Sequence, residues 1–139
     1  MQPDAAFFGE KDYQQYLVIK KMTESLKLNT RIICVKTVRD RYGLPLSSRN
    51  NYLSGQEFKI AIKINKLLKK LPPLIRTKLK INKILNHTKK VLIDHGVDKI
   101  DYLTVLNDDL SVRKKISDKS RIFIAAKIGN TRLIDNIKI

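Results

Sequence analysis

The sequence predicts an α/β fold in which a strand–helix–strand unit is followed by a small α+β domain. Three observations predict it. Two apolar runs flank a helical pattern within residues 5–38, and a polar loop rich in turn-forming residues comes next. The remainder has the pattern of two amphipathic helices followed by two or three antiparallel strands. We therefore expect one domain over residues 1–42 and a second over residues 43–139.

The composition indicates a folded protein with an excess of positive charge. Hydrophobic residues make up 42% of the 139 residues, which is enough to bury a core. Lys and Arg number 29 against 13 Asp and Glu, so the formal net charge is +16. Such a charge favours polyanionic partners, which include nucleotides, nucleic acids and anionic membranes. The charge does not choose among these partners, and a solvated lysine-rich surface is the more common explanation of it.

The single cysteine is compatible with a reduced compartment, and the hydropathy predicts no membrane span or signal peptide. Cys34 is the only cysteine, so no disulfide can form within the chain, and its apolar surroundings are typical of a buried structural thiol. No run approaches the ~20 apolar residues that cross a bilayer, and the N-terminus lacks the pattern of a signal peptide. We expect a cytoplasmic protein with no membrane partner.

The first domain is expected to contain a parallel strand pair. The segment AAFF at residues 5–8 is predicted to be a buried strand, and because nothing before it could pair with it, we expect a segment upstream. A helix is predicted over residues 12–26, with Asp12 as N-cap and Asn29 closing it. Its predicted inward side carries Tyr16, Ile19, Met22, Thr23 and Leu26. The run RIICVKTV at residues 31–38 predicts a strand buried on both faces.

The second domain is expected to begin with a loop and a well-capped helix. Residues 39–51 are polar and contain glycine, proline and two adjacent serines, which is typical of a loop. Ser54 followed by Glu57 predicts a capping box at the start of a helix. The prolines at residues 72–73 are expected to stop that helix.

A second helix and the strands of an antiparallel sheet complete the expected fold. The helix is predicted over residues 77–95, with Gly96 as its C-terminal cap. Its inward positions are Ile81, Ile84, Leu85, Thr88, Val91 and Leu92. Strands are predicted at residues 100–106, 121–128 and 131–137, with a turn at 107–110 and a hairpin at Gly129-Asn130.

The segment GEKD at residues 9–12 is the first candidate site, because it lies where a predicted buried strand meets a helix. In open α/β sheets ligands bind at the carboxyl ends of strands, and a helix start attracts anions. Lys11 could meet a phosphate, while Glu10 and Asp12 could hold a ribose hydroxyl, a magnesium ion through water, or the lysine itself. Taken alone, such a segment is more commonly a surface turn.

The segment LSSRN at residues 46–50 is the second candidate. Two hydroxyls and a guanidinium fork suit a polyphosphate, and a loop can close over one. A serine turn followed by a surface arginine is the simpler explanation of this segment by itself. His87 and His95 lie eight residues apart without a third ligand, so no metal site is expected.

The order of the motifs resembles the C-terminal half of the pantothenate synthetase (pantoate-β-alanine ligase) family. The motifs are QPD, FFGEKDYQQ, RIICVKTVR, GLPLSSRNNYLS and GNTRLIDN, and the resemblance covers essentially the whole chain. The family belongs to the nucleotidyltransferase superfamily. The resemblance implies that the first domain is the C-terminal portion of a Rossmann-like nucleotidyltransferase domain, and that the second is a small lid domain beginning with the phosphate loop.

The resemblance also implies an activity and its site residues. The family condenses pantoate with β-alanine, using ATP with magnesium, through a pantoyl adenylate, and it has no tightly bound cofactor. It implies ATP contacts from Gly9, Glu10, Lys11 and Asp12, adenine contacts from the backbone of Val38, and pantoate binding by Gln15. It further implies that Leu46, Ser47, Ser48 and Arg49 form a mobile phosphate loop analogous to KMSKS. Lys11, Ser47, Ser48 and Arg49 are the implied catalytic residues.

The chain also departs from the family pattern. Full-length members open with a histidine motif similar to HIGH and carry a further pantoate-binding glutamine, and this chain has neither. Pro45 replaces a small residue in the approach to the loop, which we expect to stiffen it. Members form homodimers through contacts mainly outside the region resembled, so a dimer is not predicted here.

Three interpretations follow from these departures. The chain is the inactive half of a split enzyme that needs a separately supplied N-terminal half, a non-catalytic remnant or lid domain, or a basic nucleic-acid-binding module. Because aromatic residues barely interleave with the lysines, nucleic acid is the least favoured partner.

Overall fold

The computed structural model describes residues 3–77, 80–111, 116–117 and 119–139. Its internal contacts divide the chain into two compact units, Met1–Val38 (unit 1) and Arg39–Ile139 (unit 2). This division falls four residues before the boundary expected from the sequence. The reason is that Arg39 bonds to residues of unit 2, as described below. The functional division at residues 42 and 43 stays a prediction.

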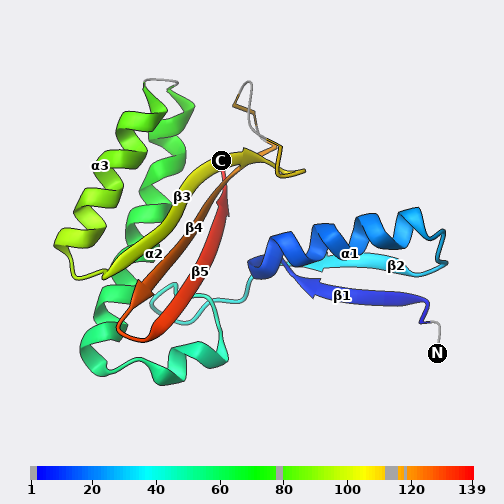
Figure 1. Ribbon diagram of the computed structural model, residues 1–139, viewed down its shortest axis with the longest axis horizontal. Helices are drawn as coiled ribbons and strands as arrows, with labels where there is room; N and C mark the ends of the chain where they lie inside the picture. The colour runs from blue at the N-terminus through cyan, green and yellow to red at the C-terminus, as the bar shows by residue number, and fades with distance from the viewer. Residues whose placement is uncertain (1–2, 78–79, 112–115, 118) are drawn as a thin grey trace. The chain divides into compact units, whose positions relative to one another are not determined.

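Unit 1 is a parallel strand–helix–strand unit, as the sequence predicts (Figure 1). Its elements are β1 (Ala5–Gly9), the 3-10 helix η1 (Glu10–Asp12), α1 (Tyr13–Ser25) and β2 (Arg31–Val35). The strands pair in parallel from Ala5↔Arg31 to Gly9↔Val35. Because both strands run the same way, their carboxyl ends lie at one edge of the pair.

The predicted burial of both strands of unit 1 is wrong. Phe7 is 67% exposed and Val35 is 44% exposed, while the residues between Arg31 and Val35 are only half-buried. A strand is buried on both faces only when a layer covers each face. Within the described part of unit 1 the only helix longer than one turn is α1, so one such layer is present.

The ends of α1 also differ from those predicted. Asp12 occupies the N-cap position, but its side chain makes no capping hydrogen bond. The helix ends at Ser25, and Lys27 rather than Asn29 turns the chain, with a φ of 49°. Leu28 N donates to Thr23 O at 3.0 Å and Lys27 N to Glu24 O at 3.2 Å, which is the Schellman pattern.

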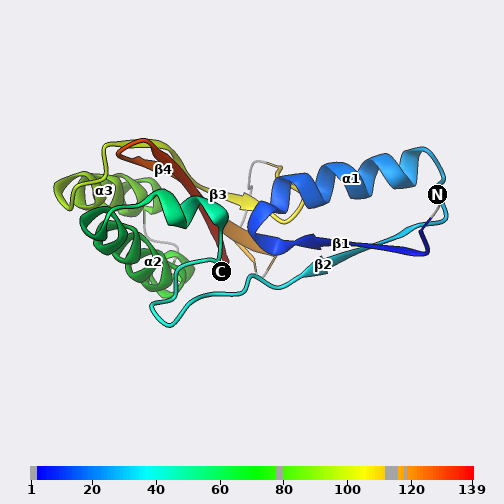
Figure 2. The same cartoon turned by 90° about the horizontal axis from the view of Figure 1, so that it is seen from below.

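Unit 2 is an antiparallel sheet packed against two helices (Figures 1 and 2). Its elements are η2 (Ser48–Tyr52), α2 (Gly55–Arg76), α3 (Ile81–Asp94), β3 (Lys99–Asn107), β4 (Ser120–Ile128) and β5 (Thr131–Lys138). The strand order is β3-β4-β5. The core brings Leu68, Ile75 and Leu92 of the helices together with Ile122 and Ile124 of β4, all at most 2% exposed. This arrangement confirms the predicted α/β fold with its α+β second part.

Two predicted helix-end signals of unit 2, the capping box and the glycine cap, are confirmed, and so is the predicted hairpin. Ser54 N donates to Glu57 Oε2 at 2.7 Å and Glu57 N donates to Ser54 Oγ at 3.3 Å, which completes the capping box. Gly96 follows α3 with a φ of 97°, as a glycine cap requires. The hairpin between β4 and β5 turns at Gly129 and Asn130, where Gly129 has a φ of 54°.

The prediction that the prolines stop α2 is wrong, because the helix runs through Pro72 and Pro73 to Arg76. A proline inside a helix removes a hydrogen bond and crowds the carbonyl four residues earlier. Here Leu71 is 3% exposed and Ile75 is 0% exposed on the core side of the same segment. Their burial offsets the cost of the prolines.

The start of α3 differs from the prediction as a result. Thr77 belongs to the end of α2, where its Oγ1 donates to Leu74 O at 2.6 Å. The second helix therefore begins at Ile81 instead of Thr77, and it ends at Asp94. Residues 78–79 lie outside the described part of the chain. Of the predicted inward positions of this helix, Ile81, Leu85, Thr88 and Leu92 are buried and Ile84 and Val91 are half-buried.

Replacing Pro73 should stabilise the protein. Pro73 is exposed, so Pro73→Ala removes little buried surface and restores an N–H that can donate to the carbonyl of Lys69. We expect the free energy of unfolding to rise by about 1 to 3 kcal/mol, measured by urea denaturation followed by circular dichroism. The control Lys70→Ala, also exposed on α2, should change it by less than about 0.5 kcal/mol. A destabilised Pro73→Ala variant would contradict this account.

Candidate functional site

The carboxyl edge of β1 and β2 gathers most of the site residues predicted in unit 1. Gly9 pairs with Val35 at the end of both strands, so Glu10–Asp12 and the segment ending at Val38 leave the sheet together. A hydrogen bond joins the two segments, since Thr37 N donates to Glu10 Oε2 at 3.4 Å. Ligands of α/β sheets bind at this kind of edge.

The side chains at this edge differ in exposure. Lys11 is half-buried in η1, Asp12 is exposed beside it, and Gln15 is exposed in the first turn of α1. The Oγ1 of Thr37 is buried and has no hydrogen-bond partner in the described part of the chain. Sequence reasoning missed Thr37, because a threonine at the end of an apolar run carries no signal of its own.

The loop predicted to bind phosphate begins with an ion pair inside unit 2. Arg39 Nη1 donates to Asp135 Oδ2 at 2.8 Å and Arg39 Nη2 donates to Asp135 Oδ1 at 2.9 Å. The same guanidinium donates to the carbonyl of Gly43 at 3.1 Å. Asp135 is 7% exposed, and Asn65 Nδ2 also donates to it, at 3.3 Å. The start of the loop is therefore fixed to β5 and α2.

The segment between Arg39 and Pro45 is a closed turn on the surface of α2. Asp40 Oδ1 accepts hydrogen bonds from the backbone N–H groups of Tyr42 and Leu44, at 2.8 and 2.9 Å. Leu44 is 5% exposed and belongs to the core. Gly43 has a φ of 87°, and a Cβ there would lie 2.6 Å from Asn65 Oδ1, so only glycine fits this position.

LSSRN follows this fixed turn and exposes the side chains of Ser48 and Arg49. Ser47 Oγ accepts from Arg49 N at 3.3 Å, which is the serine turn considered from the sequence. Asn50 Nδ2 donates to the carbonyl of Pro45 at 2.9 Å and so closes the loop. Leu46 is 57% exposed, and Ser48 and Arg49 are exposed in η2. Among the described residues, the guanidinium of Arg49 has no hydrogen-bond or ion-pair partner.

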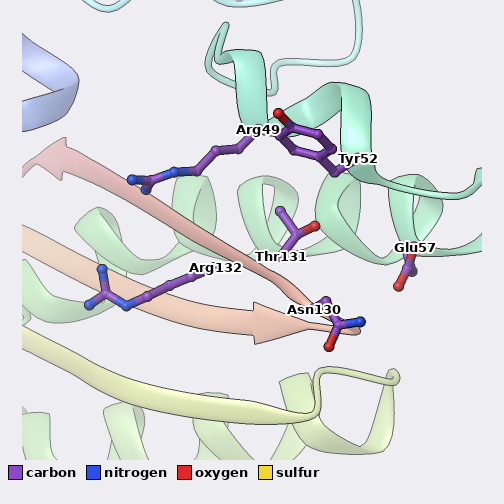
Figure 3. A pocket seen from close by; sticks show the side chains of 6 residues that line it. All are labelled: Arg49, Tyr52, Glu57, Asn130, Thr131 and Arg132. Carbon is purple, nitrogen blue, oxygen red and sulfur yellow. The ribbon is translucent and has the colours of Figure 1, made fainter.

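A pocket of about 660 Å³ lies between this loop and the β4–β5 hairpin (Figure 3). It is lined by Arg49, Tyr52, Glu57, Asn130, Thr131 and Arg132. Sequence reasoning predicted only Arg49 among these residues. The motif GNTRLIDN contains three of the others, but their residue types alone indicated no role. Contact between β5 and η2 brings them to this loop, about 80 positions away in the chain.

The described structure adds no support for a metal site or for a specific binding role of the lysine-rich helices. In the ranges that the structure describes, no three His, Cys, Asp or Glu residues come together as they would around a metal ion. The lysines of α2 and α3 mostly lie on their exposed sides, Lys59, Lys63, Lys66, Lys69, Lys70, Lys83 and Lys90 among them. A solvated basic surface, one of the explanations offered by the sequence, describes these helices.

Fold and site together define an α/β protein with polar residues at the carboxyl edge of a parallel strand pair and a basic loop in its second unit. Comparison with known families identifies the family to which the chain belongs. Residues 1–138 match the family described as pantoate-beta-alanine ligase. The chain belongs to this family, which confirms the resemblance seen in its motifs.

Relatives of this family cover the whole chain. A pantothenate synthetase of Bradyrhizobium sp. strain BTAi1 is 41% identical over 99% of this chain and 49% of its own length. One from Buchnera aphidicola subsp. Acyrthosiphon pisum is 43% identical over 100% of this chain and 50% of its own length. The chain therefore spans about half the length of these relatives.

Solved structures show the same fold. The crystal structure of pantothenate synthetase from Thermus thermophilus matches 99% of this chain with a TM-score of 0.88 and 33% identity, over 50% of its own length. A pantoate-beta-alanine ligase from Francisella tularensis, described as complexed with beta-gamma ATP and beta-alanine, matches with a TM-score of 0.72 and 34% identity. It covers 99% of this chain and 44% of its own.

Breaking the Arg39–Asp135 ion pair should destabilise unit 2. Asp135→Asn keeps the shape of the side chain but leaves Arg39, whose side chain is 22% exposed, without its carboxylate. We expect a loss of about 3 kcal/mol in the free energy of unfolding, measured by urea denaturation. Asp101→Asn, which removes the carboxylate of an exposed ion pair with Arg132, is the matched control and should shift the midpoint far less. An equal loss of unfolding free energy in the two variants would show that the Arg39–Asp135 pair stabilises the protein no more than the exposed Asp101–Arg132 pair does.

Proposed function

We propose that this chain is the C-terminal part of a pantothenate synthetase, which condenses pantoate with β-alanine at the expense of ATP. The family match over residues 1–138 is the observation that carries the proposal. The Francisella ligase described with beta-gamma ATP and beta-alanine supports these two molecules as ligands. The family favours this function over nucleic-acid binding.

The proposed reaction has two steps. A carboxylate oxygen of pantoate bonds to the α-phosphorus of ATP while the bond from that phosphorus to the bridging oxygen breaks, and pyrophosphate leaves with the electron pair. The amine of β-alanine then attacks the carbonyl carbon of pantoyl adenylate, loses a proton, and displaces AMP. Magnesium enters with ATP as the substrate complex. We propose no tightly bound cofactor.

In unit 1 the residues at the carboxyl edge are proposed to bind ATP and pantoate. The half-buried Lys11 counters charge that develops on phosphate oxygens during transfer. Gly9, Glu10 and Asp12 contact the nucleotide, and the backbone of Val38 meets the adenine. Gln15, exposed in the first turn of α1, holds pantoate with an amide that both donates and accepts hydrogen bonds.

In unit 2 the segment Leu46–Arg49 is proposed to bind the phosphates. The exposed hydroxyl of Ser48 and the guanidinium of Arg49 are donors with the geometry that phosphate oxygens accept. Ser47 accepts from Arg49 N and so shapes the turn that presents them. Catalysis by such groups consists of positioning and charge stabilisation.

The cellular location and the protein partners of the chain stay predictions. We propose a cytoplasmic protein, and no helix of the described residues is long and apolar enough to cross a membrane. We also propose that an N-terminal half of the kind found in the family completes the active site. The resemblance implies a homodimer as a family property, and none is proposed for this chain alone.

The chain by itself should not make pantothenate at a useful rate. It carries neither the histidine motif similar to HIGH nor the further pantoate-binding glutamine that the resemblance implies for a full active site. The measurement is AMP formation with pantoate, β-alanine and MgATP, first with the chain alone and then with the N-terminal half of a relative added. Restored activity would show that this half is competent for catalysis and needs an N-terminal half. Absence of restoration would favour a non-catalytic remnant, and robust turnover by the chain alone would refute the prediction.

Replacing either residue proposed to bind phosphate should slow the formation of pantoyl adenylate. The rate is measured on the chain combined with an N-terminal half that restores activity. Lys11→Ala and Arg49→Ala are each expected to reduce the rate of pantoyl adenylate formation by about 100-fold, because each removes a charge that stabilises the transition state. Pyrophosphate release gives the rate of this step. Lys20→Ala and Arg41→Ala, which remove the same charges from exposed positions nearby, should retain the rate within about twofold. A rate for Lys11→Ala or Arg49→Ala equal to that of its control would remove that residue from the proposed site.

A further inference from the structure

The pocket beside LSSRN has two walls that come from distant parts of unit 2. One wall is η2 with the start of α2, which supply Arg49, Tyr52 and Glu57. The other is the β4–β5 hairpin with Asn130, Thr131 and Arg132. The side chains of Arg49 and Arg132 both extend away from Glu57 and Asn130, toward the same end of the pocket (Figure 3). Nothing in the proposed function above uses the hairpin wall.

Arg132 is held with part of its guanidinium available. Its Nε donates to Asp101 Oδ2 at 2.7 Å, and its side chain is 48% exposed. A bond through Nε occupies the inner edge of the guanidinium, so the outer amino groups can still form a bidentate pair with an anion. The hydrogen bond to Asp101 raises the pKa of Arg132 above its ordinary value, and a lesser contribution comes from Tyr102.

The charges around the pocket leave a positive excess at this end. Asp101 is shared by two cations, because Lys99 Nζ also lies 3.3 Å from its Oδ1. One carboxylate therefore serves Arg132 and Lys99 together, and Arg49 adds a further positive charge. Glu57, the acidic residue of the lining, already accepts a hydrogen bond at Oε2 from Ser54 N.

The hairpin wall is fixed before any ligand arrives. Gly129 N donates to Asp98 Oδ2 at 2.6 Å, and Thr131 is 7% exposed. A Cβ at position 129 would collide with Glu57 Oε1, so the hairpin lies directly against the start of α2. A preorganised wall loses little entropy on binding.

We propose that Arg132 is a second phosphate-binding arginine, which holds the pyrophosphoryl group of the nucleotide together with Arg49 in this pocket. This inference deepens the proposed function and rests on it. Tyr52, Asn130 and Thr131 add hydroxyl and amide donors of the kind that phosphate oxygens accept. The pocket volume is within the range of small-molecule sites.

The proposed role follows from where charge moves in the first step. When pantoate attacks the α-phosphorus, the broken bond leaves its electron pair on the pyrophosphate. Two guanidinium groups at the pyrophosphoryl end stabilise this negative charge in the transition state. In the ground state the same oxygens carry less negative charge, so the stabilisation is smaller there. Arg132 then contributes to the departure of pyrophosphate and not to the attack of β-alanine.

Titration of the isotopically labelled chain with two phosphate ligands tests the assignment. Inorganic pyrophosphate and MgATP are added separately, and the backbone amide shifts are followed by NMR. We expect pyrophosphate to shift the amides of residues 47–52 and of residues 129–132 together. Arg132→Ala should weaken pyrophosphate binding about tenfold or more, and Arg132→Lys should bind with intermediate strength because lysine keeps the charge without the fork.

The matched control is Lys83→Ala, which removes one positive charge from an exposed position of α3 while leaving the pocket lining intact. It should weaken binding by less than about twofold. The spectrum of each variant without ligand shows whether the variant is folded. If Arg132→Ala is unfolded, the affinity of Arg132→Lys for pyrophosphate tests the proposal.

The outcomes separate this inference from the function on which it rests. Shifts at residues 47–49 without shifts at 129–132, with unchanged affinity in the Arg132 variants, would overturn the role of Arg132 and leave the phosphate loop in place. Shifts at neither segment with either ligand would overturn both. Shifts at both segments with MgATP but not with pyrophosphate would assign Arg132 to another part of the nucleotide, which also overturns the proposal as stated.

Discussion

The ion pair between Arg39 and Asp135 is the interaction on which the arrangement of unit 2 depends. It joins the first residue of the unit to its last strand, 96 positions later, through two hydrogen bonds of 2.8 and 2.9 Å. A buried carboxylate is costly unless it is fully paired, and Asp135 meets this condition with Arg39, Asn65 and the N–H of Asn136. The path of the loop follows from this pairing, because Arg39 also holds the carbonyl of Gly43.

The candidate site therefore stands on a rigid base within unit 2. The turn at Asp40 places Leu44 in the core, and Asn50 closes the loop on Pro45, so Ser48 and Arg49 project from a fixed frame. The β4–β5 hairpin reaches the same place from the other end of the chain. A site that draws on both ends of a unit can form only after the unit has folded.

How much the sequence could predict depended on how local each signal was. The capping box of Ser54 and Glu57, the cap at Gly96 and the hairpin at Gly129 are set by neighbouring residues, and all three are confirmed. The prediction that β1 is buried was wrong because burial depends on which layers cover the sheet. The hairpin wall of the pocket was missed for a related reason, since residues 130–132 reach η2 only through the tertiary packing of β5.

The prolines within α2 couple the end of a helix to the core of the unit. Helix ends ordinarily fray by themselves, because their last hydrogen bonds are few and exposed. At Pro72 and Pro73 the helix has lost two of its own hydrogen-bond donors, and the buried side chains of Leu71 before them and Ile75 after them hold it instead. The last turn of α2 therefore opens together with the core, so that the region acts as one cooperative element and not as a loose terminus.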